Sequence, residues 1–269
     1  MPLLHDAGSY EAVRDAFEWN VPERVNMAWQ VCDRHAEASP EKTGLIVAGT
    51  DGRRREYSWL ELQRLSNRMA NFMTAEGVHR GDRVGILLTQ SVEAAISHVA
   101  SWKMGAISIP LFSLFGEEAL AFRLKDSGAR VIVTEAQHYH KIEAIRDQLP
   151  ELKLVLLTDG KGGDGLRDLW QGLDKASDVF ANVDTASTDP SYIVYTSGTT
   201  GNPKGALQGH RSLIGHMPAV EFFHDFLLQS AKHEVPSHCM QLLLVGRPTC
   251  VPTEPVVIRI AVPLNILEP

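Results

Sequence analysis

The stretch SYIVYTSGTTGNPKG, from Ser191 to Gly205, joins a short β-branched and aromatic run to a loop. Its last eleven residues, from Tyr195 onward, contain three Gly, one Pro, four Thr or Ser hydroxyls and one Lys, Lys204. Such a run followed directly by Gly and Thr predicts a strand that leads into a phosphate-binding loop. Gly lets backbone N–H groups turn toward an anion, the hydroxyls add donors, and Lys adds a positive charge.

Two common phosphate-binding motifs do not describe this loop. A Walker A loop has Gly directly before its Lys and Ser or Thr directly after it, whereas Pro203 precedes Lys204 and Gly205 follows it. The glycine spacing also differs from the G-x-G-x-x-G pattern of dinucleotide-binding folds. A surface loop that is merely rich in turn residues is the alternative interpretation.

The sequence before the loop alternates between apolar runs of strand length and helical segments. The pattern predicts strands at residues 84–88, 107–110, 130–134, 152–157 and 191–195, and helices at residues 92–104, 117–126 and 137–148. This alternation implies right-handed crossovers in a mainly parallel sheet with helices on both faces. The expected fold class is therefore α/β. The stretches 161–165 and 176–189 are expected to be irregular.

The first 80 residues carry local signals. Asp51-Gly52 predicts a hairpin turn between strands at residues 44–48 and 53–57. Ser58 followed three residues later by Glu61 predicts a capping box, which opens a helix that ends at Gly77. A further helix is expected over residues 25–38.

Composition and charge disfavour several classes of protein. The 269 residues hold 26 Lys and Arg against 33 Asp and Glu, a net charge of −7, which disfavours a nucleic-acid-binding surface. No apolar run approaches the roughly 20 residues of a membrane span, and the first residues show no signal-peptide pattern. Cys32, Cys239 and Cys250 lack metal-ligand spacing and are expected to be reduced thiols of a cytoplasmic protein.

The character of the sequence changes near Phe226. Residues 227–269 contain no aromatic residue and no Asp, yet they hold six of the 14 Pro. We therefore expect two parts. Residues 1–226 form a coherent domain, and residues 227–269 form an atypical tail that is frameshifted or poorly ordered.

The loop resembles the AMP-binding motif of adenylate-forming enzymes, which include acyl-CoA synthetases, luciferases and the adenylation domains of peptide synthetases. The family pattern is Tyr or Phe, then Thr-Ser-Gly, Ser or Thr, and Thr-Gly-x-Pro-Lys-Gly, and it is matched at each position from Tyr195 to Gly205. The sequence is similar to the family upstream as well, at GVHRGDRV (77–84), GAISIPL (105–111) and LKDSGA (124–129). FEW (17–19) and NMA (26–28) are similar to the acetyl-CoA and medium-chain acyl-CoA synthetase branch.

The resemblance covers about residues 10–226 and implies the N-terminal part of the large domain of such a synthetase. It implies an AMP-forming acid–thiol ligase that uses ATP, Mg²⁺ and coenzyme A on a small carboxylic acid, in the range from acetate to medium-chain fatty acids. It also implies that the outer phosphates are held by the hydroxyls and the cation of the loop, namely Thr196, Ser197, Thr199, Thr200 and Lys204. The loop would close over them at its glycines, namely Gly198, Gly201 and Gly205.

Motifs that family members carry later in the chain do not occur in these 269 residues. There is no aromatic-Gly-x-Thr-Glu, no Thr-Gly-Asp, and no Lys in the context of the adenylating lysine. No catalytic residue is therefore assigned, and this chain alone is expected to be inactive. Two alternatives remain open: adenylation for another acceptor, as in luciferases and peptide synthetases, and a non-catalytic nucleotide-binding fragment.

Several histidines and cysteines outside the loop are further candidates for a functional role. His138 and His140 could pair on a metal ion, although a polar helix start is the favoured interpretation. His210 is expected to open the helix after the loop, in a structural role or close to the nucleotide. Nothing in the sequence around Cys239 or Cys250 would activate a thiol as a nucleophile.

Overall fold

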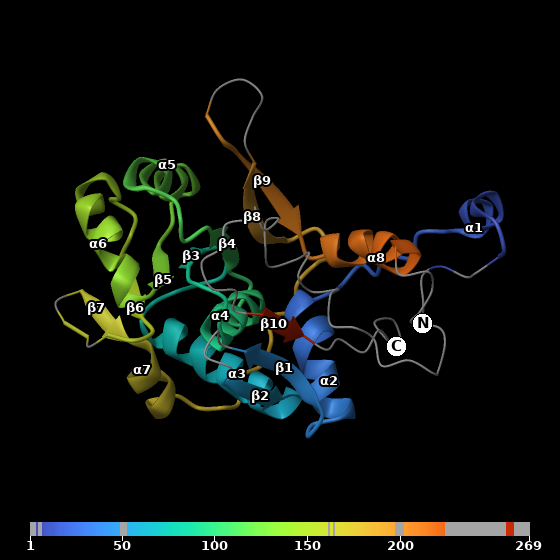
Figure 1. The fold of residues 1–269 in the computed structure, drawn as a ribbon, viewed down its shortest axis with the longest axis horizontal. Helices are drawn as coiled ribbons and strands as arrows, with labels where there is room; N and C mark the ends of the chain where they lie inside the picture. Colours follow the sequence, from blue (N-terminus) through green and yellow to red (C-terminus); the bar gives the residue numbers. More distant parts are fainter. Residues whose placement is uncertain are drawn as a thin grey trace.

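The computed structural model describes residues 4, 7–48, 53–160, 162–163, 165–196, 202–223 and 257–260. Within these residues the strands form two sheets (Figure 1). The larger sheet has the strand order β7-β6-β5-β3-β4-β8-β9, and the smaller sheet has the order β10-β1-β2.

The strands of the larger sheet are β3 (Arg83–Leu87), β4 (Ile107–Leu111), β5 (Val131–Thr134), β6 (Leu154–Leu157), β7 (Leu166–Asp168), β8 (Pro190–Thr196) and β9 (Lys204–Gly209). The helices of the chain are α1 (Tyr10–Ala16), η1 (Trp29–Asp33), α2 (Arg34–Ala38), α3 (Trp59–Ala75), α4 (Val92–Lys103), α5 (Glu117–Ser127), α6 (Ala136–Ala144), η2 (Arg146–Gln148), α7 (Leu169–Lys175) and α8 (Ser212–Phe223).

The larger sheet is mainly parallel, as the alternating pattern predicts. Each ladder from β7 across to β8 is parallel, and only the β8–β9 pair at the edge is antiparallel. The second strand of that pair was not expected, because Lys204 and Gly205 were interpreted as the end of a loop. They begin β9, so the loop connects the two strands of a hairpin.

Helices cover both faces of the sheet (Figure 1). On one face α3, α4 and α7 enclose a core that includes Val84 and Ile86. On the other face α5 and α6 enclose a core that includes Leu87 and Ile109. Ile86 and Leu87 are neighbours in β3 and join opposite cores, because successive side chains of a strand point to opposite faces. The α/β fold class with helices on both faces is thereby confirmed.

The N-terminal signals are partly confirmed. Ser58 and Glu61 form the predicted capping box of α3: the Ser58 hydroxyl accepts from the Glu61 N–H at 3.2 Å, and the Glu61 carboxylate accepts from the Ser58 N–H at 2.7 Å. The helix expected over residues 25–38 is wrong at its start. The Val25 N–H donates to the Thr185 carbonyl at 3.1 Å, so this residue lies along another segment, and η1 with α2 covers residues 29–38.

The smaller sheet contains β1 (Thr43–Ala48), β2 (Arg54–Ser58) and β10 (Val257–Ile260), with β1 in the middle and antiparallel to both neighbours. The two strands predicted around the turn are confirmed, whereas Asp51-Gly52 lies outside the described residues. Apart from β10, the region 227–269 also lies outside them, so its proposed character stays a prediction.

Candidate functional site

The candidate site lies where β8 ends and β9 begins. Thr196 is paired with Lys204, and Tyr195 with Gly205, in the antiparallel register of the hairpin. Since β8 is parallel to β4, Thr196 stands at the carboxyl end of the parallel strands, the edge at which open α/β sheets bind ligands. The structure describes three of the eight residues assigned to the phosphates; the others, Ser197, Gly198, Thr199, Thr200 and Gly201, lie outside its described residues.

Thr196 and Lys204 are exposed and stand opposite each other across the hairpin. Directly opposite residues of an antiparallel pair project from the same face, so a hydroxyl donor and an ammonium group share one side of the loop's base. Lys204 makes no ion pair with a carboxylate in the part of the chain that the structure describes. Its charge is therefore not neutralised by those groups and is available to an anion.

Tyr195 fixes the hairpin to the body of the fold. Its hydroxyl lies 2.7 Å from the Asp126 Oδ2 atom and 3.1 Å from the carbonyl oxygen of Arg123, both on α5. Burial, and then the hydrogen bond to Asp126, raise the pKa of the Tyr195 hydroxyl, so it remains a proton donor at neutral pH. The hydroxyl thus anchors the strand one residue before the loop begins.

Gly205 lies in a tight approach of the two strands. A Cβ atom at this position would lie 3.0 Å from Cγ2 of Ile193 and 3.2 Å from the ring of Tyr195. These side chains would have to move by a few tenths of an ångström to admit a larger residue, so glycine lets Ile193 and the anchoring Tyr195 ring pack closely here.

His210 follows β9 and is fully buried. Its Nδ1 atom accepts the N–H of Met27 at 3.0 Å. Burial lowers the pKa of His210 to about 4, so the ring is neutral at pH 7 and carries its proton on Nε2. A neutral buried ring contributes no charge for phosphate, and this favours the structural role among the two that the sequence left open.

The other residues singled out in the sequence do not add a second site. The His138 Nε2 atom lies 3.7 Å from Glu135, and no group of three His, Cys, Asp or Glu that could hold a metal ion occurs among the described residues. Cys239 and Cys250 lie outside those residues. No helix in the described ranges is both long enough and apolar enough to span a bilayer.

Comparison with known proteins identifies the family of this chain. The family model described as AMP-binding enzyme matches residues 32–245, which is well over half of the chain. The chain belongs to the AMP-binding enzyme family. The match includes both strands of the hairpin and all eight residues assigned to the phosphates.

Relatives of this AMP-binding chain are acyl-CoA-forming enzymes by name. The acetyl-coenzyme A synthetase of Penicillium chrysogenum is 33% identical over an alignment of 217 residues, which covers 74% of this chain and 32% of that protein. The long-chain-fatty-acid–CoA ligase FadD13 of Mycobacterium tuberculosis is 34% identical over 188 residues, which are 70% of this chain and 36% of that protein. The chain thus spans about a third of the length of the relatives it matches.

Solved structures share the fold. An acyl-CoA synthetase of Brucella canis superposes with a TM-score of 0.71 at 24% identity, over 79% of this chain and 40% of that one. A fatty acyl CoA synthetase of Mycobacterium tuberculosis superposes with a TM-score of 0.59 at 27% identity, over 70% of this chain and 35% of that one. The fold is therefore that of a part of an adenylate-forming synthetase.

Proposed function

We propose that this chain carries the ATP-binding loop of an AMP-forming acid–thiol ligase. The observation that supports the proposal best is the hairpin geometry, which presents Thr196 and an unneutralised Lys204 together at the carboxyl edge of the sheet. Membership of the AMP-binding enzyme family supports ATP as the nucleotide. The names of the relatives suggest an acyl-CoA product.

In the proposed reaction a carboxylate oxygen attacks the α-phosphorus of ATP, and the bond to the bridging oxygen of pyrophosphate breaks. The sulfur of coenzyme A then attacks the acyl carbon, AMP leaves with its oxygen, and the thiol proton is lost to a base. Both steps bring anionic groups together, so donors around the phosphates are needed. The hydroxyls and the cation of the loop, from Thr196 to Lys204, would hold the outer phosphates and then pyrophosphate.

Mg²⁺ is expected to reach the site on the nucleotide, where phosphate oxygens and water are its preferred ligands. The described residues contain no group of three His, Cys, Asp or Glu that could hold the ion, and the loop hydroxyls are the oxygen donors that we propose for it. The ion would neutralise phosphate charge when bound. The acid is proposed to lie in the range from acetate to medium-chain fatty acids. We also propose a role in fatty acid metabolism in the cytoplasm.

A second candidate is a non-catalytic nucleotide-binding fragment. It would bind ATP with the same loop without activating an acid, and these 269 residues contain none of the later family motifs. Adenylation for an acceptor other than coenzyme A is a third possibility that uses the same loop. All three functions share ATP binding through Lys204.

The shared step is tested with Lys204→Ala. Loss of one charge-assisted contact to phosphate costs about 1.5–3 kcal/mol, so Kd for MgATP should rise about 10- to 150-fold. Titration calorimetry on the 269-residue chain, with MgATP and with magnesium pyrophosphate, gives this value. Lys175→Ala is the matched control, because Lys175 is exposed at the end of α7. Equal Kd values for the Lys204 variant and the parent chain, or no ATP binding by the parent, would contradict the proposal.

A further inference from the structure

The end of the hairpin opposite the loop is tied closely to the rest of the molecule. β8 begins at Pro190 and β9 ends at Gly209, and these two residues are register partners. One step further out, the His210 N–H donates to the Asp189 carbonyl at 3.0 Å. Asp189 and His210 therefore lie side by side at the base of the hairpin, and each makes a contact with a different part of the chain.

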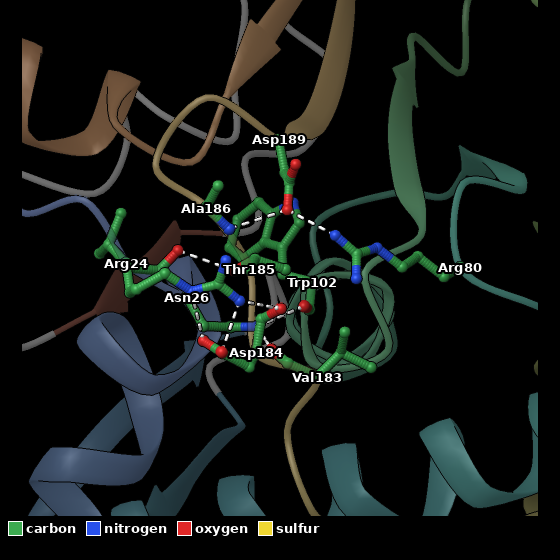
Figure 2. Close-up of polar contacts among 10 residues, drawn as sticks. Arg24, Asn26, Arg80, Trp102, Val183, Asp184, Thr185, Ala186 and Asp189 are labelled. Carbon is green, nitrogen blue, oxygen red and sulfur yellow. Dashed lines mark hydrogen bonds and ion pairs between the residues drawn. The ribbon is translucent and has the colours of Figure 1, made fainter.

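Asp189 makes the first of these contacts, through its side chain. Its Oδ2 atom accepts the Ala186 N–H at 2.8 Å and the Arg80 Nη2 atom at 2.6 Å (Figure 2). Arg80 belongs to the turn before β3, which is held by a 2.9 Å bond from the Gly81 N–H to the Gly105 carbonyl. The Asp189 carboxylate thus closes the turn that begins at Ala186. It also connects the base of the hairpin to the turn that precedes β3.

His210 makes the second contact, with the N-terminal segment around Met27. The Met27 N–H donates to its Nδ1 atom, as described above. The residues before Met27 run along the segment that precedes β8: Val25 and Thr185 exchange two hydrogen bonds, at 3.1 and 2.7 Å. The Asn26 side chain adds donors to the carbonyls of Trp102 and Val183, both at 3.0 Å (Figure 2).

These contacts set the direction of the hairpin at its base, whereas the Tyr195 hydroxyl holds it near the loop and the Trp102 Nε1 atom donates to the Ser191 carbonyl at 3.0 Å. β8 shares a single register pair with β4, Ser108 with Tyr192, and β9 is an edge strand. The segment 176–189 that leads into β8 has no helix and no strand of its own. The seven residues of β8 extend about 20 Å from the base to the loop, so a small rotation at the base displaces the loop by an ångström or more.

We propose that Asp189 is a positioning residue for the phosphate-binding loop. It acts through the hairpin: by holding Arg80 and the Ala186 N–H together with the Asp189–His210 pair, it fixes the direction in which Thr196 and Lys204 point. The inference rests on the proposed ATP-binding function. Misplacement of a binding group by about 1 Å can cost as much as 100-fold in such sites, so the effect is measurable.

The test measures Kd for MgATP by titration calorimetry on the 269-residue chain carrying Asp189→Ala or Asp189→Asn. We expect Asp189→Ala to weaken binding at least tenfold. Asp189→Asn keeps an oxygen acceptor for the Ala186 N–H and should recover part of the loss. The matched control is Glu76→Gln, which breaks the 3.1 Å ion pair with Arg167 at a residue of equal exposure, 26% of its side chain against 27% for Asp189. It should leave Kd within twofold.

A double variant separates positioning from a general loss of stability. If Asp189 acts by directing Lys204, the losses of Asp189→Ala and Lys204→Ala will not add, because a misdirected lysine contributes less. Additive losses, an unchanged Kd in both Asp189 variants, or a loss in Glu76→Gln equal to that in Asp189→Ala would overturn the inference. The proposed function has a separate outcome: if Lys204→Ala alone leaves Kd unchanged, it is ATP binding by the loop that fails.

Discussion

At the scale of single residues, buried histidines tie the stability of this molecule to pH. His98 is buried, its Nδ1 atom lies 3.0 Å from the Ser108 hydroxyl, and burial lowers its pKa to about 3. Burial also lowers the pKa of His210 to about 4. Both rings are neutral in the folded chain at pH values where an unfolded chain, with a histidine pKa near 6.5, already binds protons.

The folded chain should therefore lose stability as the pH falls from about 6.5 to about 4. In this window the unfolded chain binds more protons than the folded chain, so the free energy of unfolding decreases with falling pH and is fully retained above pH 6.5. Urea unfolding at a series of pH values measures the slope. His98→Asn, which places an amide near the position of Nδ1, should make the slope shallower. A free energy of unfolding that is flat between pH 7 and pH 4 would show that these rings are accessible to protons.

At the scale of elements, a buried ion pair joins helices that are distant in the sequence. The Lys103 ammonium at the end of α4 donates to the Asp33 carboxylate of η1. It also donates to the side-chain Oδ1 atom of Asn67 on α3, at 2.7 Å. The Asn182 side chain donates to the other Asp33 oxygen at 2.6 Å. Lys103 is 1% and Asp33 6% exposed at their side chains, so neither charge is hydrated. Through these contacts the pair connects η1, α3 and α4 with the segment before β8.

Lys103→Met should lower the free energy of unfolding by about 3–5 kcal/mol, because it leaves the Asp33 carboxylate buried without its cation. Chemical denaturation at pH 7 measures the loss. The double variant Lys103→Met, Asp33→Asn removes both charges and keeps an acceptor for Asn182, so it should be more stable than the single variant. A double variant that is less stable than Lys103→Met would show that the charge on Asp33 is not the cause.

Elements with local signals could be predicted from the sequence, and elements specified by distant contacts could not. The capping box of α3 and the alternation from β3 to β6 are confirmed, because caps and hydrophobic periodicity act within a few residues. β9 was not predicted because its first two residues, Lys204 and Gly205, belong to a motif that is typical of a loop. Pairing with β8 is what makes this segment a strand. The start of the helix at residue 25 was wrong because Thr185 competes for the backbone of Val25.

For the candidate site the sequence supplied residue types but not contacts. The motif indicated Lys204 and the hydroxyls as phosphate donors, which stays a prediction. It did not indicate Asp189, whose partners Arg80 and Ala186 come together only in the fold. The sequence also did not indicate the contact of Asp126 with Tyr195, because 69 residues separate the two and only the fold brings them together.

At the scale of the whole molecule, the hairpin is proposed to provide donors for the outer phosphates. Its outer strand β9 is the edge of the sheet within the described residues, with Leu207 56% exposed on it. An exposed edge strand with apolar side chains is a surface that proteins usually cover. The relatives are about three times as long as the part that this chain matches.

We expect that the 269-residue chain, purified by itself, does not activate a carboxylic acid. In the proposed reaction attack occurs at the α-phosphorus, whereas the loop is proposed to hold the outer phosphates. Simultaneous orientation of ribose, acid and phosphate can supply about 7–11 kcal/mol of such a barrier. The sequence contains none of the family motifs that the resemblance assigns to the ribose, the Thr-Glu pair or the adenylating lysine. Exchange of labelled pyrophosphate into ATP, with acetate, butyrate or octanoate as the acid, measures the first half-reaction. We expect the rate to equal that of the Lys204→Ala variant. Exchange clearly above that control would mean that other residues of this chain orient the α-phosphorus and the acid, and would make the chain a complete adenylating unit.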